Sequence, residues 1–106
     1  MKKSVKKPAV KRPSKAKVVS PLRLGNTVFC RTVTHYYTGR IVILSDSEIV
    51  LADAAWIADT GRFSVAMATG QLNEVEPYPD GQLVSLMRGA GCDVSDWPHR
   101  LPREAK

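Results

Sequence analysis

The sequence predicts a mainly β domain with one short helix, folded as a small, strongly bent antiparallel barrel of the SH3 or Sm kind. About five strand-like segments and one helical segment fit into about 80 residues, which is the outline of such barrels. The whole chain has 106 residues, enough for one domain. We expect an extended basic arm over residues 1–21 and the barrel, with a proline-rich C-terminal tail, over residues 22–106.

The arm is defined by proline and charge. Pro8, Pro13 and Pro21 interrupt any helix. Residues 1–23 contain no acidic residue and these nine basic ones: Lys2, Lys3, Lys6, Lys7, Lys11, Arg12, Lys15, Lys17 and Arg23. Residues 24–106 carry seven basic and ten acidic residues, a formal charge of −3. Such an arm binds phosphate groups or acidic protein surfaces without reading sequence, and the alternative is a disordered, solubilising tail.

Three strands are expected at the start of the domain. The first is T-V-F-C-R-T-V-T, residues 27–34, because it alternates and is rich in β-branched residues. A bend at Thr38-Gly39 leads to R-I-V-I-L, residues 40–44. The third strand is E-I-V-L-A-D-A-A-W-I, residues 48–57, with a bulge near Asp53. Together these strands predict an antiparallel meander.

The helix is expected over R-F-S-V-A-M-A-T, residues 62–69, whose apolar residues have helical spacing. Asp59 or Thr60 is placed to cap its N-terminus, and Gly70 is placed to end it.

Two further strands, residues 72–75 and 82–87, flank the turn Tyr78-Pro79-Asp80-Gly81, and the second can resume through Val94. Residues 97–102 are too rich in proline to be regular. The residues expected to close the barrel core are Val28, Ile41, Ile43, Val50, Leu51, Trp56 and Phe63. Both Trp56 and Trp97 are expected as core or interface anchors rather than as stacking platforms.

Asp59-Thr60-Gly61 spells the signature of aspartic proteases. Such an enzyme needs two carboxylates that share a proton, so a chain with one D-T-G would have to act as a dimer. Arg62 follows the glycine where that class has a small residue, and no glycine-rich flap is recognisable. We therefore interpret these residues as a structural corner between strand and helix, and predict no catalytic residues.

No other residue pattern predicts an enzyme. His35 and His99 have no partners at metal-ligand spacing, so we expect no metal or other cofactor. Phosphate-binding and nucleophile-elbow motifs are also missing from the sequence. Cys30 and Cys92 could pair or remain reduced thiols. We expect no membrane contact, since neither an export signal nor a run of about 18 apolar residues occurs.

A nucleic-acid contact is expected beside the first hairpin. Small β-barrels often stack bases on exposed aromatic rings next to basic side chains. Arg31, Tyr36, Tyr37 and Arg40 fit this pattern, and Phe29 lies beside them. With the lysines and arginine of residues 1–17 they are the candidate residues for binding a partner or nucleic acid. The alternative is that Phe29 belongs to the core and the tyrosines line a rim.

The chain contains the blocks C-R-T-V-T-H-Y-Y-T-G-R-I-V, I-V-L-A-D-A-A-W-I-A-D-T-G-R-F, L-N-E-V-E-P-Y-P and W-P-H-R-L-P. Over residues 25–102 these blocks resemble a family of small uncharacterised proteins of tailed bacteriophages. Members of that family usually run R-G-A-I-V-D where this chain has R-G-A-G-C-D, residues 88–93, so the last strand is expected to bend here. The resemblance implies a phage origin and no catalytic residues.

These observations favour a non-enzymatic structural protein of the virion, of the capsid-decoration, cement or connector type. Its expected partners are other copies of itself in a homo-oligomer, phage structural proteins, or nucleic acid held by the arm. The alternative is an Sm-like ring in the host cytoplasm that binds RNA or nucleotides and counters host defence. An inhibitor of one host protein is a third possibility.

Overall fold

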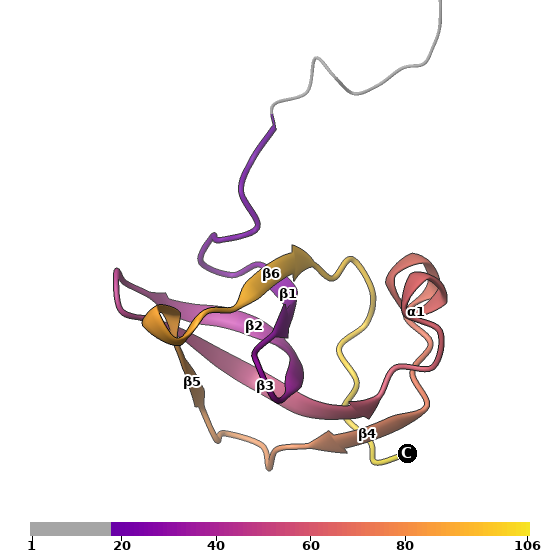
Figure 1. The fold of residues 1–106 in the computed structure, drawn as a ribbon. Coiled ribbons are helices and arrows are strands. Elements are labelled where there is room, and N and C mark those ends of the chain that lie inside the picture. Colours follow the sequence, from indigo (N-terminus) through magenta and orange to yellow (C-terminus); the bar gives the residue numbers. More distant parts are fainter. Residues whose placement is uncertain (1–17) are drawn as a thin grey trace, which may run out of the picture.

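The structure, a computed structural model, describes residues 18–106 and is mainly β, as the sequence predicts (Figure 1). Within these described residues, six antiparallel strands belong to one sheet, beside one short helix. The elements are β1 (Thr27–Arg31), β2 (Tyr36–Leu44), β3 (Glu48–Asp59), α1 (Phe63–Thr69), β4 (Glu74–Pro77), β5 (Val84–Met87), a 3-10 turn (Arg88–Ala90) and β6 (Asp93–Asp96). Most of the expected basic arm lies outside the described residues.

The sheet has the strand order β4-β3-β2-β1-β6, and β5 also pairs with β3. The predicted meander of β1, β2 and β3 is confirmed. β3 is long enough to pair with two strands along one edge, because residues 48–51 face β5 and residues 55–59 face β4. The last strand was expected to resume through Val94, but residues 93–96 form a separate strand, β6, that pairs with β1.

The sheet is not closed within residues 18–106, so the expected barrel is not confirmed. Within residues 18–106 no strand pairing joins β6 to β4 or β5. Lys106 lies along the outer edge of β4 instead: its amide donates to the Val75 carbonyl at 3.0 Å, and its carbonyl accepts from the Val75 amide at 3.2 Å. Backbone groups that could have bonded a closing strand at this point are therefore already paired.

The bulge predicted near Asp53 is confirmed and divides β3 into two halves. Asp53 has a positive φ of 51°, and the register skips between the pairs Arg40–Ala52 and Thr38–Ala55. One extra residue reverses the alternation of a strand. Leu51 before the bulge and Ala54 after it consequently lie in the same hydrophobic cluster, although they are three residues apart.

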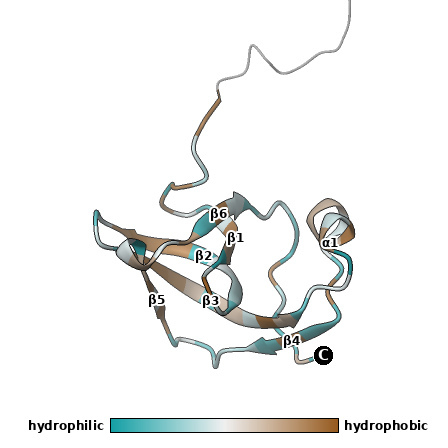
Figure 2. Ribbon diagram, in the orientation of Figure 1, coloured by the Kyte–Doolittle hydropathy of each residue, from teal (hydrophilic) through white to brown (hydrophobic). Residues whose placement is uncertain are grey.

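Each face of the bent sheet carries its own hydrophobic cluster, while β4 at the edge is largely hydrophilic (Figure 2). The first cluster consists of Val28, Cys30, Ile41, Ile49, Leu51, Ala54 and Leu86. The second consists of Phe29, Ala55, Ile57, Ala66, Leu72, Val75 and Trp97. Ala66 comes from α1 and Trp97 from the C-terminal tail, so the helix and the tail cover this second face.

Three residues expected in the core are exposed. Ile43 exposes 47% of its surface because a second register shift, between Ile41 and Ile43, turns it outward. Trp56, at 38%, lies on the open part of the first face, and Phe63, at 40%, lies at the start of α1. The other four expected core residues are buried. Trp97 is fully buried, as an anchor should be, with its Nε1 donating to the Arg100 carbonyl at 3.2 Å.

Two further differences concern local structure. The bend expected at Thr38-Gly39 is part of β2, where Gly39 lets the strands approach closely: a Cβ there would be 2.8 Å from that of Leu51. Neither Asp59 nor Thr60 caps α1, because the turn uses these residues and the N-cap position falls on Arg62. The predicted end of the helix is confirmed, since Gly70 has a φ of 82° and its amide donates to the Ala66 carbonyl at 2.8 Å.

Candidate functional site

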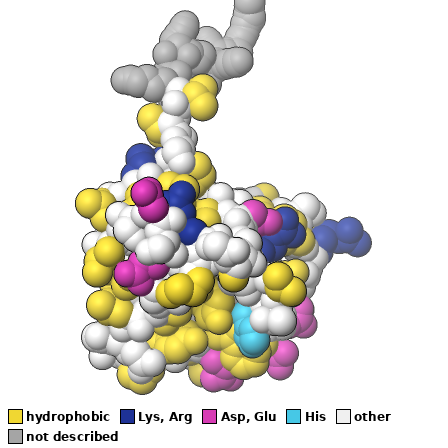
Figure 3. Space-filling view, turned by 60° about the vertical axis from the view of Figure 1, so that its left-hand side comes forward, with side chains coloured by type: hydrophobic (Ala, Val, Ile, Leu, Met, Phe, Trp, Pro, Cys, Tyr) yellow, Lys and Arg dark blue, Asp and Glu magenta, His cyan; other side chains and the backbone are white. Residues whose placement is uncertain are grey.

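An aromatic groove opens on the first face of the sheet, between the β1–β2 turn and the loop that follows β4. It has a volume of about 420 Å³ and is lined by His35, Tyr37, Trp56, Glu76, Pro77, Tyr78, Pro79 and Gln82. On the side of the molecule shown in Figure 3, hydrophobic side chains gather over the lower half, next to a histidine and bordered by acidic side chains. We call this surface the aromatic groove.

The sheet register builds the floor of the groove. Tyr37 of β2 is paired with Trp56 of β3, which is paired with Glu76 of β4. Residues paired across antiparallel strands project from the same face of the sheet. Trp56 reaches this face only because the bulge at Asp53 reverses the alternation along β3. A tyrosine, a tryptophan and a carboxylate thus stand in one row.

His35 forms one wall from the turn between β1 and β2. The turn is held by Thr32, whose amide and Oγ1 both donate to the His35 carbonyl, at 2.8 and 2.9 Å. The His35 amide donates back to the Thr32 Oγ1 at 3.0 Å. These bonds set the imidazole 6.2 Å from the Tyr37 ring centroid and 5.7 Å from that of Trp56. The three rings therefore form one aromatic surface.

Arg103 of the C-terminal tail fixes the opposite wall. Its guanidinium donates to the carbonyls of Ala54 and Tyr78 and to the Asp80 carboxylate, each at 2.9 Å. The Tyr78 amide also donates to the Ala54 carbonyl at 2.9 Å. The loop that carries Tyr78, Pro79 and Gln82 is consequently tied to β3. A groove whose walls are held in this way needs little reordering when it binds a ligand.

The charge of the groove is negative. Among the described residues Glu76 forms no ion pair, whereas the neighbouring Asp80 is paired with Arg103. Burial, together with the adjacent Tyr78 phenol, raises the pKa of Tyr37 above its ordinary value, so this hydroxyl is neutral at physiological pH. Aromatic faces beside one carboxylate attract cationic and apolar groups and disfavour phosphate.

The structure does not bring the predicted binding residues onto one surface. Tyr37 lines the aromatic groove, but Tyr36 lies against Phe29 on the other face, with ring centroids 5.7 Å apart. Arg31 is paired with Asp93 at 2.7 Å and lies over the Phe63 ring. The remaining residue, Arg40, is held by Asp53 in β3. The eight candidate residues Lys2, Lys3, Lys6, Lys7, Lys11, Arg12, Lys15 and Lys17 lie outside the described residues.

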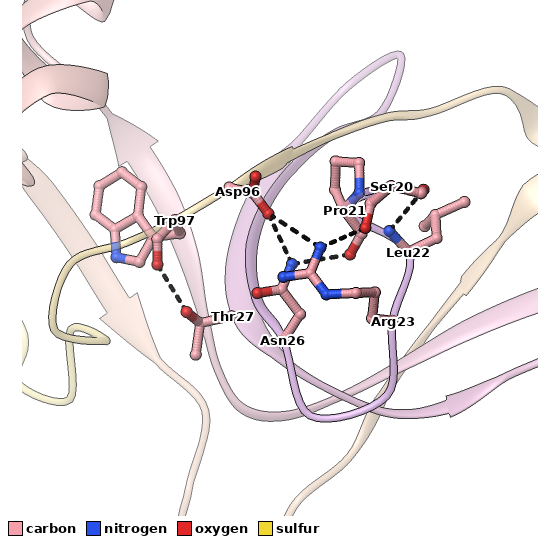
Figure 4. A network of polar contacts seen from close by, with 8 residues as sticks. All are labelled: Ser20, Pro21, Leu22, Arg23, Asn26, Thr27, Asp96 and Trp97. Carbon is pink, nitrogen blue, oxygen red and sulfur yellow. Dashed lines mark hydrogen bonds and ion pairs between the residues drawn. The ribbon is translucent and has the colours of Figure 1, made fainter. Parts of the chain in front are cut away.

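The root of the arm is attached to β6 (Figure 4). Asn26 Nδ2 donates to the Asp96 carboxylate at 2.8 Å and to the Pro21 carbonyl at 2.9 Å. Arg23 lies 3.9 Å from the same carboxylate and donates to the Ser20 carbonyl. We call Ser20, Pro21, Arg23, Asn26 and Asp96 the arm root. The arm therefore leaves the domain from a fixed place at one end of the strand order.

Asp59, Thr60 and Gly61 form a tight corner at the end of β3. The Asp59 Oδ1 accepts from the Gly61 amide at 2.8 Å, and the Asp59 carbonyl accepts from the Asn73 amide at 2.9 Å. Gly61 has a φ of 70°, a conformation that side chains with a Cβ rarely adopt. The Asp59 carboxylate is thus used in a local turn.

Cys30 and Cys92 are free thiols that form no disulfide. Burial raises the pKa of Cys30 to about 12. A thiol that keeps its proton is a poor nucleophile. Among residues 18–106 no three potential metal ligands come together, and no helix there has the length and apolar character needed to cross a membrane.

Several parts of the groove were not predicted from the sequence. Trp56 had been assigned to the core, because the effect of the bulge on alternation was not followed along β3. His35 and Arg103 gave no signal, since one lies in a turn and the other in the irregular tail. Tyr78 and Pro79 had been recognised only as part of a turn.

Comparisons with protein-family models, curated proteins and solved structures find no match. What this protein binds must therefore be inferred from the arm and the aromatic groove.

Proposed function

We propose that this protein is a non-enzymatic, virion-associated bacteriophage protein of the capsid-decoration, cement or connector type. Its arm binds neighbouring subunits or enclosed nucleic acid. The division of charge carries the proposal: residues 1–17 hold eight basic residues and no acidic one, whereas residues 18–106 hold eight basic and ten acidic residues. Opposite charges on two parts of one chain favour contacts between copies. The phage setting is supported by the four blocks that resemble phage proteins.

The arm root supports a role in assembly. Because the arm starts from a hydrogen-bonded attachment on β6, a contact made by the arm is transmitted to the folded domain. In a particle with many copies, weak arm contacts add up through their high effective concentration. The non-enzymatic part of the proposal is supported by the protonated Cys30 and by the structural use of the Asp59 carboxylate.

An Sm-like ring that binds RNA or nucleotides is the second candidate. Among the described residues, the outer edges of β5 and β6 have no strand partner, and such edges can pair between copies. An SH3- or Sm-like relationship of the fold belongs to this proposal. The ion pairs of Arg31 with Asp93 and of Arg40 with Asp53 count against it, because they neutralise the two arginines expected to contact RNA.

The first test is mass spectrometry of purified phage particles from cells that produce this protein. A virion protein is expected at a fixed ratio to the major capsid protein and should stay bound through repeated density-gradient purification. Its loss from the particles during purification would refute the virion role.

The second test concerns the arm and compares the full chain with two variants. One lacks residues 1–17, which leaves Ser20 and Pro21 of the arm root in place. The other keeps the length but replaces the eight basic residues of that segment with glutamine. If all eight basic residues contact duplex DNA, the logarithm of the binding constant should fall as the logarithm of the salt concentration rises, with a slope of about −7. Unchanged binding of DNA and of particles by both variants would refute a function of the arm.

A further inference from the structure

We propose that the aromatic groove binds the basic, proline-containing part of the arm of a second copy of this chain. This inference rests on the proposed function, in which the arm contacts neighbours, and adds the place where it docks. The groove presents an unusually exposed tryptophan, with 38% of the surface of Trp56 accessible. Large exposed aromatic residues in a preformed hollow are typical of binding sites.

The groove selects a cationic, proline-containing ligand. Proline-rich segments dock on grooves lined by aromatic rings, because their extended conformation loses little entropy on binding. His35, Tyr37, Trp56 and Tyr78 supply four such rings in one hollow. A cation placed over the face of a tryptophan ring is attracted by it. The carboxylate of Glu76, which forms no ion pair within residues 18–106, lies beside Trp56 and adds to this attraction.

The arm has the matching sequence twice. Lys6-Lys7-Pro8 and Lys11-Arg12-Pro13 each place two basic residues before a proline, five residues apart. The residue before a proline is biased towards the extended conformation that such grooves accept. With no acidic residue in residues 1–17, nothing in the arm would repel Glu76. Either step therefore supplies the cation and the proline ring that the groove selects.

The arm root and the groove lie at different ends of the sheet, and this separation favours a second copy as the occupant. The arm root is attached to Asp96 of β6, the last strand in the order, while the groove extends to Glu76 of β4, the first strand. In Figure 1 the arm leaves above β6, and β4 with its following loop lies at the bottom of the view. Copies joined arm to groove make a heterologous contact that can continue around a ring or along a surface.

The test uses the full-length protein and a synthetic peptide of residues 1–17. The peptide is titrated into the protein while tryptophan fluorescence is followed. Trp97 is buried and contributes the same background to all samples, so the change in fluorescence reports on Trp56. Light scattering over a range of protein concentrations reports self-association. The decisive pair of variants is Glu76→Gln and Glu74→Gln, which remove the same charge from the same strand, although only Glu76 lines the groove.

We expect Glu76→Gln to weaken peptide binding about fivefold, the equivalent of about 1 kcal/mol for a partly exposed ion pair, and Glu74→Gln to leave it within about twofold. Trp56→Thr should abolish the fluorescence response and most of the self-association. The peptide should also dissociate existing oligomers by competition.

Three results would overturn the inference. Equal binding by the Glu74→Gln and Glu76→Gln proteins would place the arm elsewhere. The full-length protein could stay monomeric at all concentrations and also fail to bind added peptide. That result would show that the groove is occupied by the arm of the same chain. Absence of peptide binding, together with arm-dependent binding to DNA or particles, would refute the docking site while the proposed function stands.

Discussion

Replacement of Gly70 by alanine should destabilise the fold more than the same replacement at Gly81. Both glycines have left-handed backbones, with φ of 82° and 85°. At Gly70 an added Cβ would lie 2.8 Å from both Cβ and Cγ of His99, whereas at Gly81 it would meet no atom within 4 Å. The two positions therefore share the backbone strain and differ in steric overlap.

The expected magnitudes follow from this comparison. Left-handed backbone strain costs about 1 kcal/mol for alanine, and overpacking a filled site costs about 1–3 kcal/mol more. The entropy that alanine removes from the unfolded chain is the same at both positions and cancels in the difference. His99 cannot move away freely, because its Nε2 lies 2.7 Å from the Met67 carbonyl oxygen and its ring packs edge-on against Trp97. We expect losses of about 1 kcal/mol for Gly81→Ala and about 2–4 kcal/mol for Gly70→Ala.

Equilibrium unfolding in urea, followed by tryptophan fluorescence and far-ultraviolet circular dichroism, measures both losses. His99→Gly removes the Cβ that causes the overlap, so in that background Gly70→Ala should cost no more than Gly81→Ala. Equal losses of unfolding free energy for Gly70→Ala and Gly81→Ala in the otherwise unchanged protein would refute the steric argument. The steric explanation would also fail if Gly70→Ala cost as much in the His99→Gly protein as in the unchanged one.

Three other changes have expected outcomes. Thr38→Val should raise the free energy of unfolding by about 1 kcal/mol, because the buried Thr38 Oγ1 has no hydrogen-bond partner among the described residues; a lower urea midpoint would contradict this. Above pH 9 the unfolded Cys30 thiol ionises while the buried thiol keeps its proton to about pH 12, so stability should fall by about 1.4 kcal/mol per pH unit in this range. When unfolding in urea is measured at pH 9–11, Cys30→Ala should remove this pH dependence of the free energy of unfolding. An unchanged pH dependence would show that other groups cause it. Arg103→Met should lower the free energy of unfolding by about 2 kcal/mol, because the carbonyls of Ala54 and Tyr78 lose a charged hydrogen-bond donor. The same change should speed hydrogen exchange of the backbone amides in residues 78–82. Amides that stay protected there would show that the loop keeps its conformation without Arg103.

The sequence by itself determined the features that depend on near neighbours. Alternating β-branched residues gave the meander, and Asp53 marked the bulge in β3. Helical spacing and Gly70 located α1 and its end, since both act within about two turns of chain. The separation of charge between the arm and the domain also follows from composition alone.

Tertiary structure determined which side chains form the groove, because these side chains come together through pairings between residues far apart in the chain. Tyr36 and Tyr37 lie on opposite faces because β2 begins at Tyr36 and both residues belong to this strand. Trp56 became a surface residue because one extra residue reversed its strand, and no local pattern shows which half of a bulged strand will meet the core. Arg103 reaches its partners across 25 and 49 residues of sequence. Hydrogen bonds of that range depend on how the chain is packed, so the sequence supplied the groove's side chains and only the folded sheet placed them together.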